Sequence, residues 1–283
     1  ALIGYLGAGG VLKPEIYQAA ASLELLQASA LIHDDLMDQS DTRRGAPAIH
    51  KVFEKAGSRF GENAAILIGN LALVWSQQMF DEAIEVKNQA AETILDEMRV
   101  ELMAGQFLDV LESTNKKANL ARALKIARFK SGKYTIERPL HFGAALANKE
   151  LDNYLKIYSS YGLPLGEAFQ LRDDLLGVFG DPAVTGKPAG DDLLQGKKTV
   201  LIAMACENES TQKLIDVKLG KKLNSAEVTE LRESIVASGA VAKTEDMIRQ
   251  LHGQAIESIK ASGFVKKPEL FEEMAEIATV RTR

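Results

Sequence analysis

The sequence predicts an all-α protein with a single domain. Apolar residues recur at helical spacing (i, i+3, i+4, i+7) through most of the 283 residues, with good helix formers between them. Alternating β-branched stretches bounded by tight turns, the usual sign of strands, are nearly absent. No internal repeat, low-complexity tract or linker interrupts residues 1–283, which are long enough to bury one sizeable core.

Each predicted helix rests on this spacing, and segments rich in turn residues separate one helix from the next. In the first helix, Leu23, Leu26 and Ala30 recur at helical spacing. The longest breaker, residues 180–198, holds two prolines, four glycines and three lysines, and we expect it to be a loop over one end of the domain. In chain order, the predicted helices cover residues 14–32, 63–85, 90–111, 118–147, 151–178, 199–206, 225–238, 244–261 and 268–279.

Composition excludes several functional classes. A net charge of −5 argues against a general nucleic-acid binder. The one cysteine, Cys206, cannot form an intramolecular disulfide or a cysteine-based metal cluster, and it fits a reducing, cytoplasmic setting. The four histidines form no HExxH or ExxH pair, which excludes zincin and ferritin-like di-iron sites. The most apolar segment, residues 64–75, is too short for a membrane span and is broken by Asn70.

Three carboxylates stand at the end of the first predicted helix, in the segment LIHDDLMDQSDTRRGAP. Asp34 and Asp38 are about one turn apart on one face, with Asp35 beside them. Like charges at this spacing repel, and carboxylates near a helix C-terminus also face the negative end of the helix dipole. A hard divalent cation would compensate both effects, and Arg43 and Arg44 could clamp anionic oxygens. A solvated acidic helix end with salt-bridge partners is the simpler alternative.

A second segment, FQLRDDLLGVFGDP, repeats this design far along the chain. Gln170 and Asp173 share one helix face, and Asp174 is adjacent. The lysines of the loop that follows are Lys187, Lys197 and Lys198. The recurrence favours a site built from carboxylates, Mg²⁺, polyphosphate and cations, because Mg²⁺ takes one or two carboxylates and completes its shell with water and phosphate. For either segment alone, a helix end beside a surface loop is the alternative.

Other polar residues lie on the predicted helices. Lys130 and Ser131, in ARFKSGKYTIERP, would add a phosphate-binding cation and a hydroxyl, although a lysine in a helix is usually a snorkelling surface residue. Gln27 is a candidate polar contact at a cavity mouth, and an exposed position is the alternative. Gln106 and Asp109 are interpreted as caps or surface groups.

Taken in order, the motifs DDLMD with RRGxPxxH, GQxxD, FKS, FQLRDD and GKxxGDDLxxGKKT resemble the trans-type isoprenyl diphosphate synthases, the polyprenyl synthetase family. The match covers about residues 20–200, and the ordered set is far more specific than any one motif. The resemblance implies a helical bundle around a central apolar cavity, the isoprenoid synthase fold, usually as a homodimer. It also implies Mg²⁺-dependent condensation of isopentenyl diphosphate with allylic diphosphates.

The resemblance also implies roles for individual residues, of which Asp34, Asp35, Asp38, Arg43, Lys130, Asp173 and Lys187 would form the catalytic set. The ligands of three Mg²⁺ ions would come from Asp34, Asp38, Asp173 and Asp174, with Asp35 in support. Contacts to the allylic diphosphate would come from Arg43, Lys130, Ser131, Gln170, Lys187 and Lys197. Arg44 and Gln27 would face isopentenyl diphosphate.

The chain departs from the family pattern in several places. Gly177 stands where many relatives have a third aspartate, Ser131 replaces a threonine, and Gln27 occupies the position of a family histidine. The family segment Gly-Gly-Lys-Arg-x-Arg-Pro, which binds isopentenyl diphosphate, does not occur in the sequence. Its usual place is just before the helix that Ala1 begins, so we expect the chain to lack its natural N-terminal segment.

Residues upstream of the first aspartate predict the product. Ser29 and Ala30 are small where relatives with short products often carry aromatic plugs, and Leu26 offers a partial floor. We therefore expect geranylgeranyl diphosphate (C20), with farnesyl or longer-chain diphosphates as alternatives. A non-catalytic regulatory subunit is a further alternative, motivated by Gly177 and the missing basic segment. A terpene cyclase would use the same metal chemistry, but the aromatic content of 6% and the lysine-rich loop argue against it.

Overall fold

The computed structural model describes residues 1–84, 88–147, 150–181 and 190–280, and it confirms the all-α prediction. The only strands among these residues, β1 and β2, form a two-residue antiparallel hairpin. In chain order the elements are α1 (Leu2–Gly7), α2 (Pro14–Met37), β1 (Thr42–Arg43), β2 (Ala46–Pro47), α3 (Ile49–Val52), η1 (Glu54–Ala56), α4 (Ser58–Ala83), α5 (Gln89–Ser113), α6 (Leu120–Ile126), η2 (Ala127–Glu137), α7 (Arg138–Ala147), α8 (Leu151–Phe179), α10 (Asp191–Gln195), α11 (Val200–Ala205), α12 (Glu209–Lys218), α13 (Ser225–Ala237), α14 (Ala240–Ser262) and α15 (Pro268–Val280).

The predicted helix ranges differ from the structure in several places. The elements α3, η1 and α12 were not predicted, α1 was expected only as a helix that Ala1 begins, and α2 continues to Met37, so that Asp34 and Asp35 lie inside it. The predicted helix 118–147 is divided into α6, the π-helix η2 and α7. Within the expected loop 180–198, the five residues of α10 form a short helix. No helix in the described ranges is long and apolar enough to cross a membrane.

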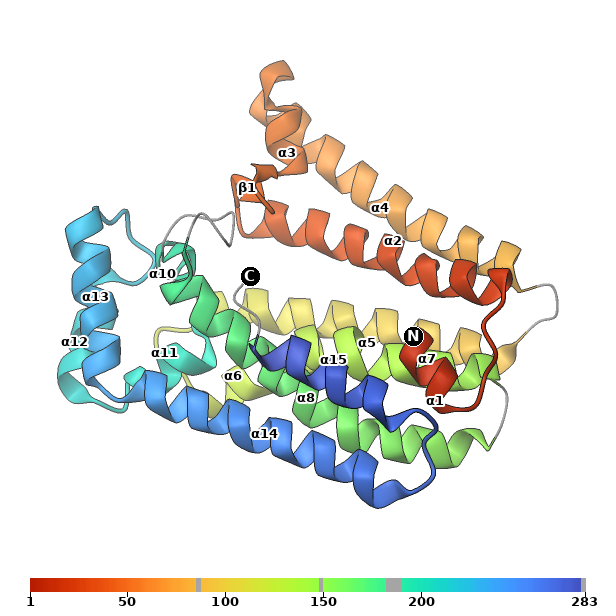
Figure 1. The fold of residues 1–283 in the computed structure, drawn as a ribbon. Coiled ribbons are helices and arrows are strands. Elements are labelled where there is room, and N and C mark those ends of the chain that lie inside the picture. The colour runs from red at the N-terminus through yellow and green to blue at the C-terminus, as the bar shows by residue number, and fades with distance from the viewer. Residues whose placement is uncertain (85–87, 148–149, 182–189, 281–283) are drawn as a thin grey trace.

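Buried apolar side chains gather in three clusters. One joins α8 to α11, α13 and α14, a second joins α7 and α8 to α15, and a third joins α2 and α4 to α5 and α7. Figure 1 shows α2 and α4 as an antiparallel pair on one side of the bundle, with α5, α8 and α14 running along the other. The third cluster therefore bridges the two sides of the bundle.

Glycines bring η2 close to its neighbours. A Cβ on Gly105 of α5 would collide with the backbone of Lys130, and a Cβ on Gly166 of α8 would collide with the backbone of Gly132. Side chains at these two positions would push η2 away from both helices. A π-helix is rare and is frequently found at functional sites. The glycines hold this one between α5 and α8, where Lys130 and Ser131 reach the same cavity.

Candidate active site

Both aspartate segments line one cavity of about 370 Å³. Its polar side chains include Asp34 from α2, Asp173 and Asp174 from α8, and Lys130 from η2. The prediction that two segments far apart in the sequence meet at one site is therefore confirmed geometrically. The predicted residues that line the cavity are Gln27, Ala30, Asp34, Arg43, Arg44, Lys130, Ser131, Gln170, Asp173, Asp174 and Lys197.

Asp34 is the most densely paired of the first three aspartates. Its carboxylate accepts from Lys130 Nζ at 2.8 Å and from Gln106 Nε2 at 3.1 Å, and Arg43 Nη2 lies 3.3 Å away. Burial opposes ionisation of Asp34, but the charges of Lys130, Lys197 and Arg43 outweigh it and hold the pKa of this carboxyl well below its usual range. Asp34 is therefore an anion at every physiological pH.

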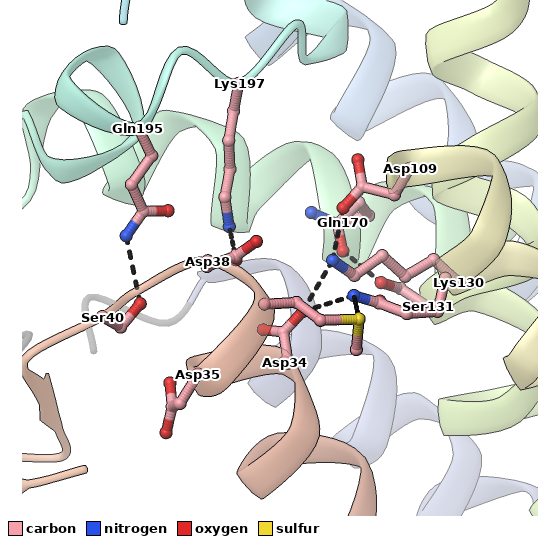
Figure 2. Close-up of polar contacts among 12 residues, drawn as sticks. Asp34, Asp35, Asp38, Ser40, Asp109, Lys130, Ser131, Gln170, Gln195 and Lys197 are labelled. Atoms are coloured by element: carbon pink, nitrogen blue, oxygen red, sulfur yellow. Dashed lines mark hydrogen bonds and ion pairs between the residues drawn. The ribbon is translucent and has the colours of Figure 1, made fainter. Parts of the chain in front are cut away.

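Lys130 links three elements at the mouth of the cavity. Its Nζ donates to Asp34 of α2 and, at 2.5 Å, to Asp109 of α5 (Figure 2). Burial alone would lower the pKa of Lys130, but the two carboxylates outweigh it and raise the pKa above its usual range. The site thus holds the Lys130 cation between the carboxylates of Asp34 and Asp109.

Two further cations pair with the other aspartates of the first motif. Arg43, on β1, donates from Nε to Asp35 at 2.9 Å. Lys197 Nζ lies 2.7 Å from Asp38, the residue that ends α2 (Figure 2). The segment after α10 is thereby tied to the first motif, and Gln195 adds a hydrogen bond of 3.1 Å to Ser40. Asp35 and Asp38 are not among the residues that line the cavity.

The second motif has a different environment. Asp174 is 2% exposed, and it accepts from Val200 N at 3.1 Å and from Gln170 Nε2 at 2.8 Å. Burial raises the pKa of Asp174 to about 7, and the charge of Asp192 adds to the shift. Gln170 accepts in turn from Ser131 Oγ. Asp173, one residue earlier, lines the cavity.

The three residues predicted to control product length occupy different positions. Ala30 lines the cavity one turn before Asp34. Ser29 and Leu26 are each 1% exposed and are not among the lining residues, so the prediction that Ser29 faces the cavity is not met by this geometry. One residue along a helix is a rotation of about 100°, which separates Ser29 from the wall that Ala30 forms. Lys187 lies outside the described residues.

The donor set of the cavity suits a hard cation. The negatively charged groups that line it are carboxylates, and Mg²⁺ prefers oxygen ligands completed by water and substrate phosphate. Within the described part of the chain, no three His, Cys, Asp or Glu side chains already converge as a metal cluster. Lys130, Lys197 and Arg43 compete for the first-motif carboxylates. These residues fit Mg²⁺ that is bound together with a diphosphate, because phosphate oxygens can draw the cations away.

Some residues of the site were interpreted from the sequence as ordinary surface groups. Gln106 and Asp109 both line the cavity and contact Asp34 and Lys130, respectively. Their one sequence signal was the spacing GQxxD, which places both on one helix face. Other lining residues are Tyr134, to which the sequence assigned no role, Asp191 and Asp192, which it noted only within the motif GKxxGDDLxxGKKT, and Lys198, which it named only among the lysines of the loop.

Comparisons with known proteins agree on one family. The model of the family described as polyprenyl synthetase matches residues 7–235. A geranylfarnesyl diphosphate synthase of Aeropyrum pernix is 35% identical over 81% of this chain and 71% of its own length. A short chain isoprenyl diphosphate synthase of Methanocaldococcus jannaschii is 33% identical over 81% of this chain and 68% of its own length. This chain is also similar to a crystal structure of geranylgeranyl pyrophosphate synthase from Corynebacterium glutamicum, complexed with isoprenyl diphosphate and magnesium. The TM-score is 0.93 and the sequence identity is 36%, and the match covers 98% of this chain and 84% of that chain.

Proposed function

Because the chain belongs to the polyprenyl synthetase family, we propose that it condenses isopentenyl diphosphate with allylic diphosphates in this cavity and forms mainly geranylgeranyl diphosphate. The enzyme class is prenyltransferase, as in the relatives and structural neighbours. One observation carries the assignment of the site to this chain. Asp34 of α2 and Asp173 of α8 line the same cavity as Lys130, so carboxylates and a cation surround one space.

Mg²⁺ is the cofactor of this family, and the proposal assigns up to three ions to Asp34, Asp38, Asp173 and Asp174, with Asp35 in support. Bound Mg²⁺ would neutralise the diphosphate and stabilise it as a leaving group. Of the four carboxylates, Asp34, Asp173 and Asp174 line the cavity, and Asp38 is held beside it by Lys197.

The cations of the site would bind the diphosphate of the allylic substrate. Lys130, Arg43 and Lys197 each hold a carboxylate in the structure, and each could exchange that partner for a phosphate oxygen. Fixed positive charge at the departing oxygens lowers the barrier to ionisation because negative charge develops there. Ser131 and Gln170 would complete this contact surface, with Lys187. Arg44 and Gln27 would face isopentenyl diphosphate.

The apolar wall would protect the allylic cation. Ala30, Leu31 and Leu102 line the cavity on the α2 and α5 sides, and Phe169 lines it from α8. Side chains of this kind exclude water, which would otherwise quench the cation before the alkene attacks. No protein base is required, because the departed diphosphate can accept the proton lost after condensation.

Product length follows from the depth of this wall. Ala30 joins the third core cluster, in which Leu23 and Leu26 are its neighbours on α2 and Phe142 contributes from α7. A turn of helix is about 5.4 Å long, which is close to one extended isoprene unit. A small residue at position 30 would leave room for an additional unit above this floor. The likeness to a geranylgeranyl pyrophosphate synthase structure supports C20.

A homodimer is proposed because apolar side chains remain exposed on two long helices. On α5 the exposed set follows a helical spacing and comprises Val100, Met103, Phe107 and Val110. On α4 it comprises Leu67, Leu71, Val74 and Trp75. Exposed apolar faces of this kind mark interaction sites with other chains. Sedimentation of the protein should give the mass of a dimer, and Phe107→Lys should shift it toward the monomer.

The alternatives differ in what they would produce from the same substrates. The relatives are named as synthases of several chain lengths, which does not favour a non-catalytic subunit. A terpene cyclase would release hydrocarbon from a prenyl diphosphate alone. A farnesyl or longer-chain synthase would give the same chemistry with a different product.

The test is a product assay with the full chain, Mg²⁺, labelled isopentenyl diphosphate and an allylic primer. Geranyl and farnesyl diphosphate should both serve as primers, and the label should accumulate in a C20 diphosphate. Chelation of Mg²⁺ by EDTA should abolish the reaction, and added Mg²⁺ should restore it. Absence of any labelled prenyl diphosphate with every primer would refute the proposed function.

A further inference from the structure

The αα-hairpin of α12 and α13 lies outside the cavity and yet contacts the segment that carries Lys197. Figure 1 shows the two helices at one end of the bundle, beside α10. Thr211 Oγ1 of α12 donates to the carbonyl of Ser234 of α13 at 3.2 Å. No residue of α12 or α13, both of which the structure describes in full, lines the cavity. Any influence of the α12–α13 hairpin on the proposed reaction must therefore pass through the elements that it contacts.

Glycines on both sides of α10 meet the α12–α13 hairpin at close range. Before α10, a Cβ on Gly190 would lie 2.9 Å from Cγ1 of Val228, which lies on α13. After α10, a Cβ on Gly196 would lie 3.0 Å from Cα of Gly220, in the connection between α12 and α13. All three glycines have positive φ (74° to 75°), a conformation that suits glycine. The α12–α13 hairpin thus holds α10 at both ends.

Hydrogen bonding and burial strengthen this contact. Gly220 N donates to the carbonyl of Leu193, within α10, at 2.9 Å. The side chain of Leu193 is fully buried in a core cluster that also contains Val228. At the end of α8, the carbonyl of Val178 accepts from Arg232 Nε of α13 at 2.6 Å. The α12–α13 hairpin is therefore fixed to the bundle independently of α10.

The segment held in this way reaches both aspartate motifs. Lys197 directly follows Gly196, and its Nζ lies 2.7 Å from Asp38 of the first motif (Figure 2). Three residues later, Val200 N donates to Asp174 of the second motif at 3.1 Å. Lys197 also lines the cavity. A displacement of the backbone at Gly196 would therefore move the Lys197 cation relative to the cavity.

We propose that the α12–α13 hairpin positions the Lys197 cation, and that Gly220 is the residue through which it acts. The backbone contact between Gly220 and Gly196 fixes where the chain leaves α10, and with it the place of Lys197 Nζ. The inference rests on the proposed function for its diphosphate. It deepens that function by adding two positioning residues, Gly220 and Val228, that do not line the cavity.

A small side chain at position 220 tests this inference. Gly220→Asn places a Cβ 3.3 Å from Cα of Gly196, so that Gly196 has to give way by a few tenths of an ångström. Asparagine adopts left-handed backbone conformations more readily than other residues with a side chain, which limits the strain. Gly239→Asn is the matched control, because Gly239 also has positive φ (81°) and an added Cβ would meet none of the other described residues within 4 Å. The readout is the affinity for inorganic pyrophosphate with Mg²⁺, measured by titration calorimetry, which requires no turnover.

We expect Gly220→Asn to bind pyrophosphate about 5-fold to 10-fold more weakly than the wild type, because a hydrogen bond to a charged group is worth roughly tenfold or more in affinity and part of it is lost. Gly239→Asn should equal the wild type. Lys197→Ala should bind about tenfold more weakly. Gly220→Asn added to Lys197→Ala should cause no further loss, because one residue acts through the other.

A second variant reads the other contact of the α12–α13 hairpin. Val228→Ala withdraws the side chain that meets Gly190, and it adds no atoms that could prevent folding. It should weaken pyrophosphate binding in the same direction by a smaller factor, and again only while Lys197 is present. This variant decides the question if Gly220→Asn does not fold.

Three results would overturn the inference. One is a folded Gly220→Asn that binds pyrophosphate as tightly as Gly239→Asn. The second is an equal further loss on the Lys197→Ala background, which would mean that the α12–α13 hairpin acts through other residues. The third is wild-type affinity in Val228→Ala when Gly220→Asn does not fold. The proposed function fails separately, because a wild type that shows the expected binding pattern but forms no prenyl diphosphate would refute the condensation reaction alone.

Discussion

Two clusters of largely buried ion pairs join η2 to α5, and they differ in what surrounds them. In the cavity cluster, Lys130 donates to Asp34 and Asp109, and all three line the cavity. In the inner cluster, about two turns earlier on α5, Glu101 accepts from Lys133 and Arg138. No residue of the inner cluster is among those that line the cavity. The same pairing chemistry thus faces the cavity at one level and lies outside it at the next.

The difference separates a binding role from a structural one. Cations of the cavity cluster can exchange carboxylates for phosphate, because a ligand can reach them. Cations of the inner cluster do not line the cavity: Arg138 pairs outward with the exposed Glu97 at 2.8 Å, and Lys133 also lies 3.7 Å from Glu137, which continues the cluster into the bundle. Ser159 donates to Glu137 at 2.6 Å and lies 3.1 Å from His141, whose Nε2 also lies 3.0 Å from the carbonyl of Leu155. We infer that the inner cluster fixes η2 against α5, α7 and α8 and so positions Lys130.

The largest effect is expected from neutralising the anion of the cavity cluster. Asp34→Asn should lower kcat by about 10³-fold, as expected when a preorganised group that acts on the developing charge is removed. The melting temperature should also fall, because the Asp34 anion contributes to stability, but the loss is limited since Lys130 keeps Asp109 and Arg43 keeps Asp35 as partners. Steady-state turnover with labelled isopentenyl diphosphate and thermal unfolding measure the two quantities. Near-normal turnover would remove Asp34 from the proposed metal site.

The matching change in the inner cluster should act on stability. Glu101→Gln removes the anion that Lys133 and Arg138 share, while Arg138 keeps Glu97 and Lys133 keeps Glu137. Loss of charged hydrogen bonds of this kind should lower the unfolding free energy by about 1–3 kcal/mol. Urea unfolding measures that loss, and turnover per folded molecule should stay close to the wild-type value. A thousandfold loss of turnover at unchanged stability would instead place Glu101 in the binding machinery and erase the contrast between the clusters.

The pH dependence of stability should distinguish the same two clusters. Burial, with the charge of Arg138, lowers the pKa of His141 from an ordinary 6.5 to about 4. The folded protein therefore keeps His141 neutral while the unfolded chain binds a proton, so stability is lost as the pH falls from about 6.5 to about 4. Asp34 acts differently. Because its pKa is lowered in the fold, its contribution to the unfolding free energy is retained until the pH falls below 3.8, the ordinary pKa of an aspartate.

His141→Gln isolates this effect. The variant should show a flatter dependence of unfolding free energy on pH between 7 and about 4.5 than the wild type. Because only the slope is compared, a constant loss of stability from the substitution does not disturb the result. Equal slopes in the two proteins would mean that His141 binds a proton as readily in the fold as in the unfolded chain, and that the inner cluster does not shield it.

The sequence predicted the cavity cluster better than the inner one, and the reason is physical. Asp34 was recognisable because it shares one helix face with another aspartate, and because a second acidic segment of similar design occurs later in the chain. Glu101 and Lys133 follow an ordinary amphipathic pattern, so nothing distinguishes them from exposed ion pairs. Their meeting depends on η2, whose π-helical turns were expected to continue one α-helix. A spacing of 3.6 residues cannot describe side-chain directions there.

The first motif shows a similar limit at the scale of one residue. The helical spacing predicted that Ser29 and Ala30 both form the wall before Asp34, but of these two only Ala30 lines the cavity. Ser29 is buried, and its neighbours along the same face include Ser22, whose carbonyl accepts from Ser76 of α4 at 2.8 Å. Which of two adjacent residues faces the cavity depends on how α2 is rotated against α4. That rotation follows from packing between the helices and cannot be read from α2 alone.

The smallest effect on the reaction rate is expected from a substitution in the apolar wall of the cavity, away from both ion-pair clusters. Ala30→Phe should shorten the product by about one isoprene unit, because the ring would occupy about one helical turn of the cavity below Asp34. Turnover with the shorter primer should remain near wild type, since the ion pairs of the cavity cluster are untouched. Ser29→Phe is the matched control, and it should mainly destabilise the protein because Ser29 is buried and does not line the cavity. Chromatography of the products gives their chain length and distinguishes the two variants. If Ser29→Phe shortened the product and Ala30→Phe left it unchanged, Ser29 and not Ala30 would face the growing chain.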